Sequence, residues 1–121
     1  MGTKVKVLCI EDDPVIHSLM RRILEQSGFG FVGAREGREG LDQARAHKPD
    51  LIVLESRTSR VDGWDVYRQI KADGELRDIP VIMVLPYAQQ VDRDLGPDGY
   101  IAKPFHPSEL LSEIYAVLGI D

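Results

Sequence analysis

The feature that most restricts the fold of this chain is the stretch of residues 51–54, which are all apolar. The stretch follows Pro49 and Asp50 and ends at the charged residue Glu55. A strand with one face in water alternates polar and apolar residues, so this uniform stretch predicts a central parallel strand covered on both faces. Parallel strands cannot be joined by a tight hairpin and need a crossover, usually a helix. The chain should therefore alternate strands with helices.

The rest of the sequence has this alternation. Further strands are predicted at residues 5–10, near 31–32, at 79–85 and at 100–102, and helices at 14–27, 38–47, 63–72 and 107–118. The first helix should be capped by Asp12 or Asp13 and ended by Gly28, with Leu19 in its inward stripe. Right-handed crossovers place helices on both faces of a parallel sheet. The prediction is a three-layer, doubly wound α/β protein with five parallel strands.

The connection between the last two predicted strands differs from the others. Residues 86–98 include Pro86, Gly96 and Pro97, which leave room for two turns of helix at most. The sequence thus predicts a fourth helix that is short, displaced or mobile.

Size and charge limit the function classes. A chain of 121 residues fits one domain, here residues 1–121, and the single cysteine, Cys9, excludes an internal disulfide. The net charge is −5, and no basic cluster stands out to bind a phosphate backbone, so direct nucleic-acid binding is not expected. The apolar stretch before Glu11 is too short for a signal peptide or a membrane span. We therefore expect a cytoplasmic protein without membrane attachment.

Charged residues follow three of the predicted strands. Glu11 and Asp12 follow the first strand, Glu55 ends the third, and Lys103 follows the fifth. Ligands of open parallel sheets bind outside the carboxyl ends of the strands, and Mg²⁺ prefers carboxylate and water ligands. If the first and third strands are neighbours, the pattern predicts a metal site of Glu11, Asp12 and Glu55. The alternative is that these acids only cap helices and solvate loops.

Several motifs resemble the response-regulator receiver domain, the CheY-like module of two-component signalling. The matching segments are residues 7–14, 49–55, 62–64, 79–84 and 100–105. The resemblance implies a flavodoxin-like strand order 2-1-3-4-5 and a cis peptide between Lys103 and Pro104. It also implies that Glu11 and Asp12 bind Mg²⁺, that position 55 accepts phosphate from a histidine kinase, that position 85 supplies a hydroxyl, and that Lys103 contacts the phosphate.

The chain departs from the family pattern at two of these positions. The phosphoacceptor position holds Glu55 in place of aspartate, and the hydroxyl position holds Leu85. A third departure is Ser59, which replaces the proline of the loop after the phosphoacceptor. The extra methylene of Glu55 moves its carboxylate where reacting atoms must approach in line, and it can reach toward Lys103 instead. These changes predict an atypical receiver, a pseudo-receiver, with impaired or absent phosphorylation and weak Mg²⁺ binding.

Such a module would act as a non-enzymatic signalling protein that binds other proteins. The expected partner is a histidine kinase or a downstream signalling protein, on a face that includes Tyr100, Lys103 and Phe105. One alternative is a working receiver that accepts phosphate slowly on Glu55 or Asp13. Another is a small Mg²⁺-dependent phosphohydrolase that uses the predicted metal site.

Overall fold

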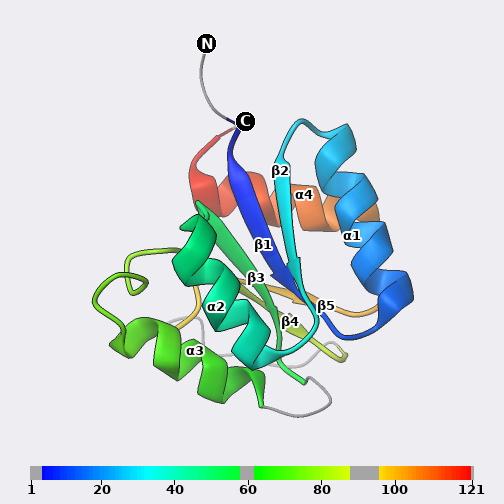
Figure 1. Cartoon of the computed structure of the whole chain (residues 1–121). Coiled ribbons are helices and arrows are strands. Elements are labelled where there is room, and N and C mark those ends of the chain that lie inside the picture. The colour runs from blue at the N-terminus through cyan, green and yellow to red at the C-terminus, as the bar shows by residue number, and fades with distance from the viewer. Residues whose placement is uncertain (1–3, 58–61, 88–95, 121) are drawn as a thin grey trace.

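The computed structural model describes residues 4–57, 62–87 and 96–120. The elements are β1 (Lys6–Ile10), α1 (Pro14–Gln26), β2 (Gly30–Ala34), α2 (Gly37–His47), β3 (Leu51–Glu55), α3 (Gly63–Ala72), β4 (Val81–Leu85), β5 (Gly99–Ala102) and α4 (Pro107–Leu118). Strands and helices alternate as predicted from β1 to β4, whereas most of the connection from β4 to β5 lies outside the described residues. All strand pairs are parallel, and the order β2-β1-β3-β4-β5 is the predicted one. The sheet lies between two layers of helices (Figure 1).

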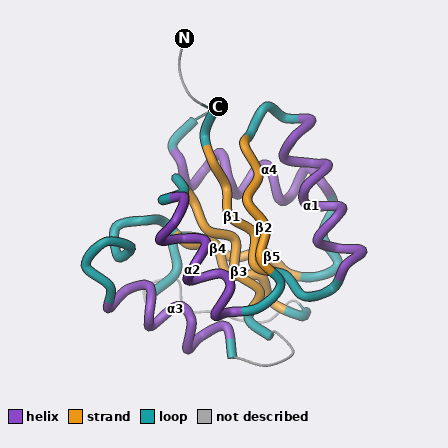
Figure 2. The backbone as a smooth tube through the Cα atoms, viewed as in Figure 1, coloured by secondary structure: helices purple, strands orange, loops and turns teal. Residues whose placement is uncertain are grey.

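The two faces of the sheet carry separate hydrophobic cores. Alternate residues of β1 divide between them, with Leu8 and Ile10 in one core and Val7 and Cys9 in the other. Helices α2 and α3 cover the first core, and α1 and α4 cover the second (Figures 1 and 2). Every residue of β3 is buried, which explains why its sequence shows no polar alternation.

Local signals set the ends of the elements. The first helix is capped by Asp13, whose carboxylate accepts hydrogen bonds from the N–H groups of Val15 and Ile16 at 2.9 and 3.4 Å. The fourth strand begins at Val81 instead of the predicted residue 79. Pro80 has no N–H to donate to a strand ladder, although its carbonyl accepts a hydrogen bond from Ile52.

Three further observations concern expectations from the sequence. The peptide bond between Lys103 and Pro104 is cis, as the family resemblance implied. The predicted short helix after Pro86 falls largely on residues 88–95, which lie outside the described residues. In the parts of the chain that the structure describes, no helix has the length and apolarity required to span a bilayer.

One predicted core residue is misplaced. Leu19 was expected in the inward stripe of α1, but it is 38% exposed, and Val15 one turn earlier is also exposed. Met20, Ile23 and Leu24 define the buried direction of this helix, and Leu19 lies on its flank. The helix therefore presents apolar side chains to solvent beside its core stripe.

Candidate functional site

The carboxyl ends of the strands bring three charged residues together. Strand register places Ile10 beside Leu54, so that the residues that follow them, Glu11 and Glu55, leave neighbouring strands at the same level. Lys103 follows β5, and its N–H donates to the carbonyl of Leu85 at 2.8 Å. Strand β4 separates β3 from β5, and the long lysine side chain bridges that distance.

The ammonium of Lys103 contacts both glutamates. Its Nζ lies 2.8 Å from Oε1 of Glu11 and 2.5 Å from Oε2 of Glu55. The second oxygen of Glu11 accepts the backbone N–H of Asp13 at 3.1 Å, and that of Glu55 accepts the N–H of Arg57 at 3.4 Å. We call Glu11, Glu55 and Lys103 the acid–lysine cluster. Each carboxylate oxygen in it has a donor or the ammonium beside it.

The cluster is shielded from water. The side chains of Glu11, Glu55 and Lys103 are 1%, 3% and 20% exposed. Buried charges of this kind are tolerated when they are paired and hydrogen-bonded. Two carboxylates nevertheless share one ammonium, so the fully ionised cluster carries one net negative charge.

Burial and this imbalance change the protonation of the cluster. Burial raises the pKa of Glu55, and the hydrogen bond and charge of Glu11 raise it further. The hydrogen bond from Lys103 lowers it, and the net result is a pKa of about 7. For Lys103, burial lowers the pKa, but hydrogen bonds and charges of the two glutamates outweigh burial and raise it. Lys103 therefore remains charged at neutral pH, whereas Glu55 takes up a proton near pH 7.

The start of α3 is packed tightly against the backbone of Glu55. The Gly63 N–H donates to the carbonyl of Ser56 at 3.0 Å. A Cβ added at Gly63 would lie 2.1 Å from the carbonyl oxygen of Glu55. Only glycine fits there, so this contact fixes the backbone from which the Glu55 side chain extends.

The substitution Gly63→Ala should lower the free energy of unfolding by about 1–3 kcal/mol, because either the helix or the end of β3 must move. Chemical denaturation measures this effect. The matched control is Gly74→Ala, since a Cβ at Gly74 meets nothing within 4 Å. Equal stability of the two variants would show that α3 does not restrain Glu55.

The other predicted site residues lie apart from the cluster. Asp12 is half-buried and forms no hydrogen bond or ion pair within the described residues. Leu85 and Tyr100 are buried in the core on the α2–α3 side. The sequence analysis predicted Tyr100 on the partner face, but this residue is only 8% exposed. Ser59 lies outside the described residues.

The structure adds an apolar hollow beside the cluster that the sequence analysis missed. It has a volume of about 250 Å³ and is lined by Ile16, Leu19, Pro86, Lys103, Pro104 and Phe105. A sequence signal for an apolar surface here was the pair Val15 and Leu19. They lie four residues apart on α1, and apolar residues at this spacing share a helix face. Two residues of the predicted partner face, Lys103 and Phe105, therefore do line a surface hollow.

The parallel sheet in the order 2-1-3-4-5, with acids after β1 and at the end of β3 and a lysine after β5, defines a CheY-like α/β module. Residues 7–115 match the response regulator receiver domain. The chain belongs to this family of two-component signalling domains.

Relatives and solved structures agree with this assignment. The chain is 38% identical over 117 residues to the polar-differentiation response regulator DivK of Brucella anthropi, covering 93% of this chain and 95% of that protein. The chemotaxis response regulator CheY4 of Vibrio cholerae has a similar fold, with a TM-score of 0.85 at 23% identity over 95% of this chain and 99% of that one.

A third similar protein was solved with a metal. The receiver domain of a sensor histidine kinase from Pseudomonas aeruginosa has a TM-score of 0.86 at 27% identity, covering 97% of this chain and 99% of that one. It holds a magnesium ion coordinated in its active site cleft.

Proposed function

We propose that this receiver domain signals through protein–protein contacts, with phosphorylation of position 55 impaired or absent. The observation that carries the proposal is the double ion pair of Lys103 with Glu11 and Glu55. The lysine assigned to phosphate binding in this family is here already paired with two carboxylates of the protein itself.

Phosphoryl transfer to Glu55 would require the cluster to rearrange. The attacking oxygen must approach phosphorus in line at about 3–3.5 Å, but one Glu55 oxygen contacts the ammonium and the other faces the Arg57 N–H. An incoming phosphate would also have to compete with Glu11 for Lys103. Leu85 offers an apolar side chain where the family pattern supplies a hydroxyl. The arrangement thus favours a domain held near one state.

The experiment is incubation of the whole chain with a small-molecule phosphodonor and Mg²⁺, followed by intact-mass measurement. We expect little or no mass increase. One phosphoryl group per chain located on Glu55 would overturn the proposal, and one located on Asp13 would establish the slow phosphoacceptor alternative. Asp13 is exposed but caps α1, so its modification would also weaken that helix.

The residues proposed for Mg²⁺ do not fit a resident ion as they stand. Among the described residues, no group of three or more His, Cys, Asp or Glu side chains is arranged to hold a metal. The Glu11 and Glu55 oxygens that would face the ion contact Lys103 instead. We therefore propose that a divalent cation binds only weakly, because it has to displace the ammonium.

Titration with MgCl₂ should shift the amide signals of residues 11–13 and 55–57 with millimolar rather than micromolar half-saturation. A titration with choline chloride at matched ionic strength controls for screening. Unchanged signals would contradict even weak binding, and micromolar saturation would show that the cluster opens readily.

For the partner, we propose a histidine kinase or a downstream signalling protein that contacts the apolar hollow beside Lys103. The hollow adjoins the acid–lysine cluster, and the exposed side chains of Val15 and Leu19 extend the apolar surface along α1. Apolar side chains that gather on a surface in this way are typical of protein-binding sites.

A further inference from the structure

The two inner oxygens of the acid–lysine cluster, Oε1 of Glu11 and Oε2 of Glu55, share one partner. Both atoms are buried, and within residues 4–57, 62–87 and 96–120 no other group reaches them with a hydrogen bond. The Lys103 ammonium lies 2.8 Å from the first and 2.5 Å from the second. A buried carboxylate is costly unless a positive charge or hydrogen-bond donors compensate it. At these two atoms the compensation therefore comes from Lys103.

The contacts of the ammonium resemble those of a bound cation. Carboxylate oxygens surround Ca²⁺ at about 2.3–2.6 Å, and Mg²⁺ in proteins commonly keeps several waters and binds through one or two carboxylates. The two contacts of Lys103, at 2.8 and 2.5 Å, are only slightly longer than those to Ca²⁺. A second cation between the same oxygens would be repelled strongly, because like charges interact over a short distance in a buried site. The ammonium and a divalent ion are thus mutually exclusive partners of Glu11 and Glu55.

A cation that the chain itself carries has an advantage over one from solution. The backbone of Lys103 is attached to β4 by the hydrogen bond from its N–H to the carbonyl of Leu85, at 2.8 Å, and its side chain is only 20% exposed. Attachment to the chain removes most of the translational entropy that a free ion loses on binding. A singly charged ammonium can therefore compete with a doubly charged ion.

The length of the side chain at position 55 contributes to this arrangement. An aspartate there would withdraw the carboxylate by one carbon–carbon bond, about 1.5 Å. The contact with Lys103, now 2.5 Å, would then lengthen to the outer limit of an ion pair. The departure from the family pattern at position 55 and the double ion pair of Lys103 are therefore two parts of one arrangement.

We propose that the Lys103 ammonium is the resident cation of this site and takes the place of Mg²⁺. The inference rests on the proposed function, because it assigns a role to the lysine of the same cluster. The cluster then stays closed whether or not Mg²⁺ is removed. Taking away the ammonium should uncover a divalent-cation site that the parent protein keeps closed.

The test compares MgCl₂ titrations of the whole chain before and after Lys103→Met, followed by the amide signals of residues 11–13 and 55–57. Half-saturation should occur at a Mg²⁺ concentration at least about tenfold lower in Lys103→Met than in the parent, since two carboxylates lose their internal cation. Lys48→Met removes the same charge from an exposed position and should leave half-saturation unchanged. Equal half-saturation in Lys103→Met and the parent, or an equal gain in both lysine variants, would overturn the proposal.

A second measurement does not depend on the folding of Lys103→Met. Glu55→Asp keeps the lysine and shortens the carboxylate, so that Mg²⁺ meets less competition. Between EDTA and about 1 mM MgCl₂, the Tm should change little in the parent and rise clearly in Glu55→Asp, because an ion that binds the folded state stabilises it. An equal rise in both proteins would contradict the proposal.

The two proposals about this site can fail separately. A parent protein that takes up phosphate on Glu55 but has a Tm independent of Mg²⁺ would contradict the proposed function and support Lys103 as the resident cation. A parent protein that takes up no phosphate but is stabilised by Mg²⁺ as much as Glu55→Asp would do the reverse.

Discussion

Replacing Lys103 by methionine should lower the free energy of unfolding by about 3–5 kcal/mol at pH 8, because two buried carboxyl groups lose the ammonium between them. Methionine keeps most of the side-chain volume, so the loss reports charge more than packing. Urea denaturation of the variant and the parent protein measures the difference.

The size of this effect should depend on pH in a defined direction. In the parent protein the pKa of Glu55 rises from an ordinary 4.5 to about 7 on folding. The protonated form is therefore the one that the fold favours, and the contribution of Glu55 to stability is complete below pH 4.5 and is lost as pH rises through 7. Without Lys103 the ionised form is even less favourable, so the variant should lose more stability than the parent between pH 5 and 8.

The matched control is Lys48→Met, which removes an exposed lysine whose Nζ lies 4.0 Å from Glu75. Surface pairs of this kind contribute about 0–1 kcal/mol. If Lys103→Met were no more destabilising than Lys48→Met at pH 8, the acid–lysine cluster would not be a buried ionic unit.

The second large effect concerns chemistry. Glu55→Asp should raise phosphoryl uptake from a small-molecule donor with Mg²⁺ by about 100-fold over the parent, because misplacement of a reacting group by 1 Å costs about that factor. The shorter side chain also withdraws from Lys103 and leaves the ammonium available to the phosphate. Intact mass over time measures the rate.

Glu55→Asn is the control, because the asparagine side chain has the same length as that of aspartate. It should stay unmodified, since an amide is not a phosphoacceptor. A further change, Leu85→Thr, should increase uptake in the Glu55→Asp background if the missing hydroxyl contributes. Failure of Glu55→Asp to gain any phosphate would show that features beyond residue 55 prevent the reaction.

Local sequence signals predicted the alternating strands and helices, whereas the strand order came from the family resemblance. The uniform apolar stretch of β3 predicted burial on both faces, and proline and aspartate marked the start of α1. These signals depend on residues close together in the chain, so they can be read without knowledge of tertiary contacts. The positions of Glu11, Glu55 and Lys103 followed because parallel strands bring their carboxyl ends to one edge.

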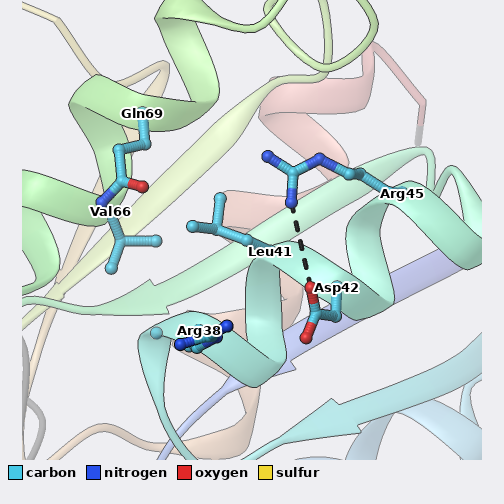
Figure 3. A pocket seen from close by; sticks show the side chains of 7 residues that line it. Arg38, Leu41, Asp42, Arg45, Val66 and Gln69 are labelled. Carbon is cyan, nitrogen blue, oxygen red and sulfur yellow. Dashed lines mark ion pairs between the residues drawn. The ribbon is translucent and has the colours of Figure 1, made fainter.

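Features that depend on packing between distant elements were harder to predict. Asp12 and Asp13 are the same residue type, and only the geometry of the turn selects Asp13 as the cap. The buried face predicted for α1 was too wide, because the spacing of apolar residues does not show which of them a neighbouring element covers. A shallow groove between α2 and α3, lined by Arg38, Arg45 and Gln69 among others (Figure 3), was also not predicted, because it forms only when two separate helices meet on the sheet.

The strand order has a consequence for how the chain folds. β1 sits between β2 and β3, so the first 55 residues contain both of its partners, and we expect these three strands to pair without needing β5. These strands already bring Glu11 and Glu55 side by side, whereas Lys103 arrives only when β5 docks on β4. Until then the two acids repel each other unless one is protonated. The last strand therefore stabilises the first three by supplying a charge, and this couples the two ends of the chain into one cooperative folding unit.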